Sequence, residues 1–435
     1  MSKYPLYYYL ILLAGLILAI VFWFSVFSIN TQNTSTATGT VNGNNVNYLS
    51  QPVPIEKIEK DKESGRSVAS NILNIAVKDT TNISAKFLAD FDAKYQNTDY
   101  KIIYADSVIN YFQVEIPDGE RISFKKKIKE DLDKYQLLVW DEALFSRQAE
   151  SADNWYISQT GIDKIKNTDA EKQIKIAVLD NGFDLQHDAL SDKSELAYNA
   201  TDGSGNVSPA NENHGTHVAS LAAGKHTSNF RGVCEECKII PVKAQDVNNN
   251  ITTSYIIKGI LYSIKNGAKV INLSLGANLV SEPIPENIQQ QFIKNGAKDE
   301  EEFWDNLFQY AEEKKVLCVI AAGNSHLLTG FDPFQRSPYT IKVGAIDDSG
   351  SPADFSNYGP LTTLYAPGTN IFAAKPGNLY ESLDGTSMAA PIVSGFVAVL
   401  KARNPEKSNQ EIRDLLMANT VEMNGVKVLK NINLN

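Results

Sequence analysis

The sequence contains few of the residues that hold metals and redox centres. Of its 435 residues, three are cysteines and five are histidines. Cys234 and Cys237 form one Cys-x-x-Cys pair, whereas structural zinc needs a second such pair and a thioredoxin-like motif needs its own fold context. We therefore expect a local disulfide between them, as is usual outside the cell. Cys318 lies inside an apolar strand-like run and is expected to be a buried hydrophobe.

Basic residues are also in deficit. Lys and Arg number 41 against 51 Asp and Glu, which gives a formal net charge of −10. This charge disfavours general nucleic-acid affinity, so we expect no nucleic-acid partner. No internal repeat is visible, and the length suggests about three domains of roughly 150 residues each.

One segment near the start has no charged residue at all. Leu6 to Ile29 is nearly all apolar, and about 20 such residues cross a bilayer. Lys3 precedes it and the next charge is Glu56, so the positive-inside rule places the rest of the chain outside the cytoplasm. A cleaved signal peptide, which would leave the protein secreted, is the alternative; its apolar core would be only about 7–15 residues long. We expect residues 1–29 to be a single-pass membrane anchor.

Two further regions precede the C-terminal part. Residues 30–69 are rich in Asn, Thr, Ser and Gly and then in charge, which predicts a flexible tether. Residues 70–150 are predicted to form a small domain with the βαββαβ order of a ferredoxin-like split unit. Its expected elements are Ile72–Val77, Ser84–Tyr95, Tyr100–Ala105, Tyr111–Ile116, Glu120–Tyr135 and Leu137–Trp140.

The segment Gly385-Thr386-Ser387-Met388-Ala389-Ala390-Pro391 indicates a nucleophile. It places Ser387 just before an apolar run, Ile392 to Leu400, that predicts a buried helix. The N–H groups and dipole of a helix N-terminus favour the negative charge that attack by a serine creates. We expect Pro391 in the first helical turn, where proline is tolerated. A serine that only caps a core helix is the alternative.

A serine nucleophile needs a base, usually a histidine. His214 and His217 lie in a segment of small residues that predicts a loop entering a helix. A hydrogen-bonded core histidine is the alternative for either, and we favour that alternative for His217.

The base in turn needs an orienting group. Ile174 to Leu179 predicts a buried parallel strand with Asp180 at its carboxyl end, where the catalytic groups of open α/β sheets gather. An aspartate that forms a turn is the alternative. The order Asp180, His214, Ser387 is that of the subtilisin-type triad.

Together these segments resemble the subtilase family, serine peptidases of the subtilisin type, from about Trp155 to the C-terminal end. The resemblance implies a three-layer α/β fold with a mostly parallel sheet over residues 151–435. The matching segments are Val178–Gly182, His214–Ala219, Val270–Gly276, Ala321–Asn324 and Gly385–Pro391.

The resemblance also assigns further residues to the site. It implies that the Asn324 amide donates to the oxyanion, a contribution of roughly 3 kcal/mol to the barrier. It further implies that the substrate backbone and the cleft wall involve Ser274, Leu275, Gly276 and Gly323. Loops around Tyr255, 275–279 and 327–336 would shape the cleft.

Several positions depart from the family pattern. Asn181 replaces the usual Ser or Thr, and its side chain can still hydrogen-bond a carboxylate, so we expect Asp180 to stay oriented. The Cys-containing segment Gly232–Lys238 replaces a Gly-Val-Ala-Pro run. A calcium ligand of the family would fall at Ala189, and Gly224–Arg231 replaces the usual Asn-rich loop. Neither offers the oxygen ligands that calcium needs, so we expect no metal at that site, whereas calcium elsewhere stays open.

The segment Ala277–Glu313 is longer than the family pattern. It contains Asp299–Lys315, a predicted amphipathic helix. The residues expected on its apolar side are Phe303, Trp304, Leu307 and Phe308.

In this family a domain such as 70–150 is a propeptide that assists folding and inhibits through its tail. Here that tail would be Ala143–Ser151, just before Asn154-Trp155-Tyr156. We expect self-cleavage between Phe145 and Asn154, which makes the chain's own propeptide its first partner. A plain domain that spaces or docks the rest is the alternative.

The resulting prediction is a serine endopeptidase acting on proteins or peptides, with no cofactor required. Ser387 would attack, His214 would move the proton and Asp180 would orient His214. A catalytically silent domain for binding or scaffolding is the alternative. A lipase or esterase would need a Gly-x-Ser-x-Gly elbow and the order Ser, acid, His, and the sequence around Ser387 has neither.

Overall fold

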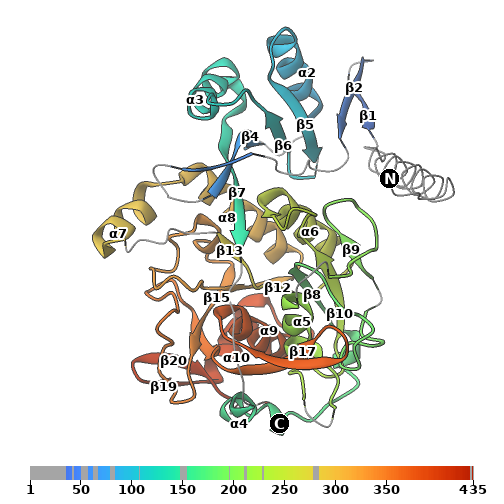
Figure 1. Cartoon of the computed structure of the whole chain (residues 1–435), viewed down its shortest axis with the longest axis vertical. Coiled ribbons are helices and arrows are strands. Elements are labelled where there is room, and N and C mark those ends of the chain that lie inside the picture. The colour runs from blue at the N-terminus through green and yellow to red at the C-terminus, as the bar shows by residue number, and fades with distance from the viewer. Residues whose placement is uncertain are drawn as a thin grey trace, which may run out of the picture.

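The computed structural model describes residues 36–41, 44–49, 57–61, 67–78, 84–106, 108–146, 154–194, 196–209, 213–227, 230–277, 284–431 and 434. The predicted anchor at 1–29 lies outside the described residues. Within the described ranges, no helix has both the length and the apolar character needed to cross a membrane. Figure 1 shows a smaller N-terminal domain, residues 36–146, above a larger C-terminal domain, residues 154–434.

The N-terminal domain has the predicted βαββαβ order. Its central strands run in the order β5-β6-β4-β7, and all three pairs are antiparallel. The elements are β4 Ser67–Val77, α2 Ser84–Tyr95, β5 Lys101–Asp106, β6 Tyr111–Glu115, α3 Arg121–Asp131, a 3-10 turn Asp133–Tyr135 and β7 Leu137–Ser146. One face of this sheet packs on α2 and α3 around Phe87, Phe112 and Phe124.

The predicted flexible tether is wrong in part. Within residues 30–69 the structure has three strands, β1 Thr36–Val41, β2 Asn44–Leu49 and β3 Ile58–Lys60. β1 and β2 pair in antiparallel register, and β2 lies beside β5. Three threonines lie in β1 and each strand has one valine, and an Asn-Gly pair joins the strands in the sequence, which is the strongest short-range hairpin signal. Overall polarity concealed this local pattern.

The C-terminal domain is built on the predicted, mostly parallel sheet. Its strand order is β19-β20-β16-β15-β14-β12-β8-β10-β9, with β19 antiparallel at one edge. The strands are β8 Lys175–Asp180, β9 Tyr198–Asn199, β10 Lys238–Lys243, β12 Val270–Leu273, β14 Leu317–Ala321, β15 Thr340–Ile346, β16 Leu364–Pro367, β19 Thr420–Met423 and β20 Val426–Leu429. Short strands outside this sheet are β11 Ile251–Thr252, β13 Gly276–Ala277, β17 Ile371–Lys375 and β18 Leu379–Leu383.

Helices cover both faces of this sheet, which explains why its strands are apolar on both sides. The helices are α4 Trp155–Thr160, α5 His214–Ala223, α6 Thr253–Lys265, α7 Glu286–Asn295, α8 Lys298–Glu313, α9 Thr386–Arg403 and α10 Asn409–Ala418, with 3-10 turns Ile162–Lys164, Glu171–Gln173 and Pro333–Gln335. Alternate strand residues such as Val178 and Val270 pack with α5 and α9, whereas Leu179 and Ile271 pack with α6 and α8.

Three of the local predictions are confirmed. Cys234 and Cys237 form a disulfide, and Cys318 is buried with the pKa of its thiol raised to about 12 by that burial. The helix α8 buries the four predicted side chains Phe303, Trp304, Leu307 and Phe308.

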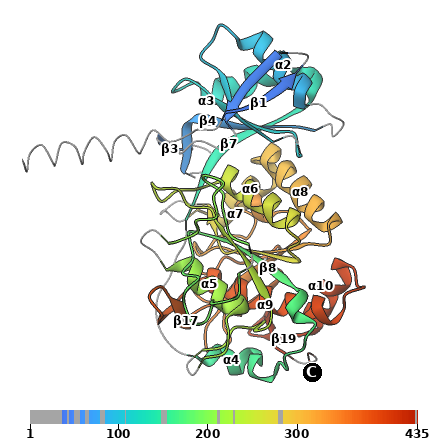
Figure 2. The same ribbon diagram turned by 90° about the vertical axis from the view of Figure 1, so that its right-hand side faces the viewer.

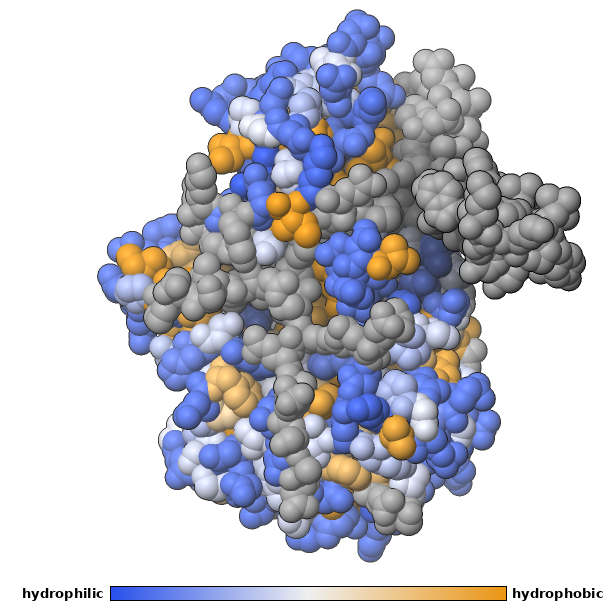
Figure 3. All heavy atoms as spheres, in the orientation of Figure 1, coloured by the Kyte–Doolittle hydropathy of each residue, from blue (hydrophilic) through white to orange (hydrophobic). Residues whose placement is uncertain are grey.

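The N-terminal domain docks through its open sheet face on α6 and α8 (Figure 2). Trp140 of β7 stacks on Phe303 of α8 with ring centroids 4.4 Å apart. Large hydrophobic side chains that stay exposed in the described chain come from separate elements, and on the face in Figure 3 hydrophobic residues are scattered among hydrophilic ones.

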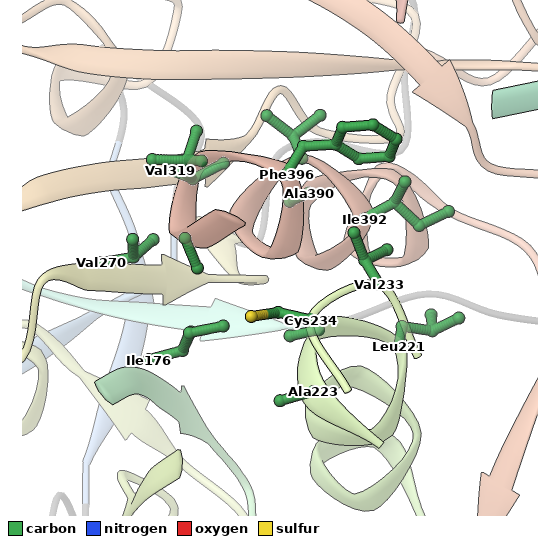
Figure 4. Packing of buried hydrophobic residues seen from close by; sticks show 14 of the residues in the cluster. Ile176, Leu221, Ala223, Val233, Cys234, Val270, Val319, Ala390, Ile392 and Phe396 are labelled. Carbon is green, nitrogen blue, oxygen red and sulfur yellow. The ribbon is translucent and has the colours of Figure 1, made fainter. Parts of the chain in front are cut away.

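The helix α9 is buried along nearly its whole length. Ala390, Ile392 and Phe396 pack among strand residues and the α5 region in Figure 4. At Gly395 a methyl group would collide with Val233 and lie 2.7 Å from the Ala222 carbonyl oxygen. This glycine therefore sets how closely α9 approaches α5.

We expect Gly395→Ala to destabilise the protein, although alanine is the better helix former by about 1 kcal/mol. Overpacking at a rigid backbone contact costs typically about 1–3 kcal/mol. The control is Gly205→Ala, where the added methyl meets only an ordinary contact at 3.8 Å. Thermal unfolding should show a lower Tm for Gly395→Ala alone; an unchanged or higher Tm would contradict the packing argument.

Candidate active site

The predicted acid and base lie together at the carboxyl edge of the central sheet. Asp180 ends β8, and His214 is the first residue of α5. His214 Nδ1 lies 2.8 Å from Asp180 Oδ1 and 2.9 Å from Oδ2, and both side chains are 2% exposed. A buried carboxylate at this distance holds one imidazole tautomer, with the proton on Nδ1, and stabilises the charged ring.

Asn181 joins the strand of the acid to the helix of the base. Its backbone N–H donates to Asp180 Oδ1 at 2.8 Å, and its side-chain Oδ1 accepts from the Gly215 N–H at 2.9 Å. Asn213, the N-cap residue of α5, makes no side-chain capping bond. The Asn181 amide therefore satisfies one of the N–H groups that a helix start leaves without partners.

Ser387 is the second residue of α9. The helix begins at Thr386, because Gly385 has φ +145°, a conformation that glycine reaches without strain. Ser387 Oγ donates to the Ser274 carbonyl oxygen at 3.2 Å. His214 Nε2 is buried without a hydrogen-bond partner in the described chain. The structure thus pairs His214 with Asp180 but not with the Ser387 hydroxyl, and such bonds commonly tighten only when substrate is bound.

The expected place of Pro391 is wrong. It is the sixth residue of α9 and lies in the second turn, because the helix starts six residues before the apolar run at Ile392. Apolar periodicity could not show that start, which Gly385 sets through its backbone conformation.

Asn324 follows β14 and faces the N-terminus of α9. Its Oδ1 accepts from Thr386 N–H at 2.9 Å and from Thr386 Oγ1 at 2.7 Å. Because Oδ1 is engaged, the Nδ2 group is the end that can donate to a developing oxyanion. Thr386 Oγ1 also accepts from the Gly323 N–H at 3.0 Å. Sequence reasoning did not assign Thr386 this role; its only signal was its place between Gly385 and Ser387.

Three of the four substrate-binding candidates lie at the end of β12, and the fourth, Gly323, follows β14. Ser274 and Leu275 follow this strand and are buried, and Gly276 begins β13. Two further polar residues were missed, Asn272 in β12 and Ser394 in α9, both fully buried and hydrogen-bonded to each other at 2.8 Å. Each of them is a polar residue inside an apolar run of the sequence, and this position could have indicated a buried hydrogen bond.

The end of β7 lies between two short strands of the C-terminal domain. Phe145 pairs with Ile251 of β11 and with Ala277 of β13, and Ser146 pairs with Gly276, both in antiparallel register. Figure 1 shows β7 running from the upper domain to β13. The chain's own segment is thus the middle strand of a three-stranded arrangement beside Ser274.

His217 is a core residue, in line with the interpretation we favour. It is fully buried, and Nε2 donates to the Glu381 carbonyl oxygen at 3.3 Å. Burial, with a smaller effect of nearby His214, lowers the pKa of His217 to about 3. The ring is therefore neutral in the folded protein.

Beside Ala189, where the resemblance would place a calcium ligand, the structure has a lysine. The Lys225 N–H donates to the Ala189 carbonyl at 2.9 Å, and its Nζ lies 3.1 Å from Ser191 Oγ and from Asp192 Oδ2. An ammonium group beside these oxygens disfavours a metal cation. Among the residues that the structure describes, no group of three or more His, Cys, Asp or Glu side chains could hold a metal ion.

An α/β protein with these side chains at the carboxyl edge of its sheet has the features of a serine hydrolase. The family model described as the subtilase family matches residues 171–432. The chain belongs to the subtilase family.

Relatives and solved structures agree with this assignment. The chain is 34% identical over 253 residues to thermophilic serine proteinase from Bacillus sp. (strain AK1), covering 58% of this chain and 57% of that protein. It is 33% identical over 249 residues to subtilisin Savinase from Lederbergia lenta, covering 56% of this chain and 81% of that protein. The match thus spans little more than half the length of the Bacillus relative.

Two crystal structures show the same fold. A cold-adapted subtilisin-like serine proteinase aligns with a TM-score of 0.51 at 26% identity, covering 65% of this chain and 99% of that chain. Fervidolysin from Fervidobacterium pennivorans, a keratinolytic enzyme related to subtilisin, aligns with a TM-score of 0.63 at 21% identity, covering 88% of this chain and 64% of that chain.

The buried His217 should make stability fall with acidification. Its pKa is about 3 when folded against an ordinary 6.5, so between these values the unfolded chain takes up a proton that the folded chain does not. This contribution is fully present above pH 6.5 and is lost as the pH falls toward 3. The Tm of wild type minus that of His217→Gln should therefore shrink between pH 7.5 and 4.5. A constant difference would contradict a neutral His217.

Proposed function

We propose that this chain is a serine endopeptidase that cleaves proteins or peptides and is made as a membrane-tethered zymogen. The observation that carries the proposal is the buried Asp180–His214 pair, 2.8 Å apart, at the same sheet edge as Ser387. Family membership supports the reaction class, and the names of both curated relatives describe proteinases or subtilisins.

In the proposed reaction Ser387 Oγ attacks the peptide carbonyl. His214 Nε2 takes the hydroxyl proton and returns it to the leaving amine, while Asp180 stabilises the charged imidazole. The Asn324 Nδ2 group and the Ser387 backbone N–H bind the oxyanion, and removing one such donor typically lowers kcat by about 10²–10³-fold. This chemistry requires no metal or organic cofactor.

The substrate main chain would bind as β7 does. An extended strand between β11 and β13 gives main-chain recognition, with Gly276 as a pairing residue and Ser274, Leu275 and Gly323 along the cleft. Residues 70–150 are then the propeptide domain, and residues 151–435 the peptidase domain.

The contacts of the N-terminal domain support an inhibitory propeptide. The buried Glu142 carboxylate accepts from Ser254 N–H at 3.3 Å and from Ser254 Oγ at 3.0 Å, at the start of α6, and from Asn74 Nδ2 at 2.7 Å. Lys129 pairs with Asp299 of α8. These contacts come from residues that precede the tail Ala143–Ser151 in the chain, so they would keep the two domains bound after a cut in the tail.

The register of β7 supports a proposal for the bond that is cut. In the antiparallel pairing, Ser146 stands opposite Gly276. By sequence count alone, each further residue of the tail would correspond to one position back toward Ser274. Counting two residues from this pair reaches Gln148, and the Ser274 carbonyl is the group that accepts the Ser387 hydroxyl. We therefore propose a cut between Gln148 and Ala149, which themselves lie outside the described residues.

The membrane location rests on the sequence of residues 1–29, with the peptidase on the outer side. If that anchor stays on the propeptide, self-cleavage would leave the peptidase attached only through the domain contacts. Cleavage of the anchor or loss of the propeptide would make it a secreted enzyme.

We expect the wild-type full-length chain to process itself to a fragment that begins at Ala149. The Ser387→Ala variant, as a matched control, should stay at full length because it lacks the nucleophile. Gel electrophoresis with N-terminal sequencing of the product checks both points. Identical band sizes for the two proteins would contradict self-cleavage and favour a silent binding domain. A new N-terminus other than Ala149 would contradict the bond proposed from the register, and one outside residues 146–154 would contradict self-cleavage in the tail.

A further inference from the structure

The proline in α9 removes a hydrogen bond from the nucleophile. In the interior of an α-helix each N–H donates to the carbonyl four residues earlier, and proline has no N–H. Pro391 lies in the second turn of α9, so the carbonyl that loses its helical donor is that of Ser387. A buried carbonyl without a donor costs about 1–3 kcal/mol.

Ser274 supplies the missing donor from another element. Its hydroxyl donates to the Ser387 carbonyl at 2.8 Å, and both residues are at most 4% exposed. The Ser274 carbonyl in turn accepts the Ser387 hydroxyl at 3.2 Å. Two reciprocal hydrogen bonds therefore tie the nucleophile to the end of β12.

The direction of the Ser274 hydroxyl is itself set by buried neighbours. Asn272 Nδ2 donates to Ser274 Oγ at 2.9 Å, which leaves the Ser274 proton for the Ser387 carbonyl. Asn272 Oδ1 accepts from Ser394 Oγ of α9 at 2.8 Å. The chain of bonds thus starts on α9, crosses β12 and returns to α9 at the nucleophile.

We propose that Ser274 is a positioning residue for Ser387, and that its hydroxyl acts by replacing the helical N–H that Pro391 lacks. This inference rests on the proposed peptidase function and adds to the main-chain role of Ser274 in substrate binding. It follows that Ser274 would hold the substrate strand through its main chain and Ser387 through its hydroxyl. Ser274 therefore fixes the distance between the bound peptide and Ser387 Oγ.

Pro391 provides a test that distinguishes a hydrogen-bonding role of the Ser274 hydroxyl from a role in packing alone. Pro391→Ala restores an N–H in register with the Ser387 carbonyl. In the full-length chain, Ser274→Ala should slow self-processing. It should also lower kcat on a chromogenic peptide about tenfold, with little change in KM, since a loss of 1.36 kcal/mol of transition-state stabilisation lowers the rate tenfold.

Pro391→Ala alone should keep a kcat within about twofold of wild type, because the Ser387 carbonyl keeps its Ser274 donor. The double variant should recover most of the loss, and Ser274→Thr, which keeps a hydroxyl, should lose less than Ser274→Ala.

A double variant as slow as Ser274→Ala alone would overturn the inference. So would a loss in Ser274→Ala that appears only in KM.

The replacement of the Ser274 hydroxyl by an N–H at position 391 can also be measured through Tm, without an activity assay. In a Ser387→Ala background the backbone carbonyl remains, and the chain cannot cut itself by the proposed route. Ser274→Ala should lower Tm in this background, and Pro391→Ala should reduce that loss. Additive Tm changes would overturn the inference. If the Tm changes are not additive but the wild-type chain does not process itself, only the proposed function would be overturned.

Discussion

The contact between the start of α9 and the end of β12 is the interaction on which the site depends. Ser387 and Ser274 exchange two hydrogen bonds there. α9 is apolar around its circumference and is buried along most of its length, so its position is set by packing against α5 and the sheet. A serine at the end of such a helix cannot shift without disturbing the core.

The parallel sheet explains why distant residues meet. β8, β12 and β14 are adjacent, and Leu179, Leu273 and Ile320 stand at the same level in them. The residues that follow are Asp180, Ser274 and the segment leading to Asn324. Parallel strands end at one edge, so three segments far apart in the sequence bring a carboxylate, a serine and an amide to one place.

Much of this arrangement could be predicted from the sequence. The βαββαβ order, the buried strand before Asp180 and the amphipathic α8 follow from apolar periodicity, which reports burial directly. The chain order of Asp180, His214 and Ser387, together with the resemblance of their segments to the subtilase family, led to the site candidates.

Other features depend on contacts that periodicity does not report. The start of α9 is set by the backbone of Gly385, so the expected position of Pro391 was one turn wrong. The Asn181 amide that caps α5 acts across 34 residues of sequence. Thr386 orients Asn324 only because β14 and α9 meet in the fold. The β1–β2 hairpin was not predicted, because the polar composition of residues 30–69 indicated a flexible tether despite the Asn-Gly pair between the two strands.

The central claim is that Ser387 is a nucleophile activated by His214. It is tested most directly by mapping the adduct of a fluorophosphonate by mass spectrometry after the N-terminal domain has been removed. The account predicts one adduct, on Ser387, formed far more slowly in His214→Ala and absent in Ser387→Ala. An unlabelled Ser387 in the wild type, or equal labelling rates in wild type and His214→Ala, would contradict it.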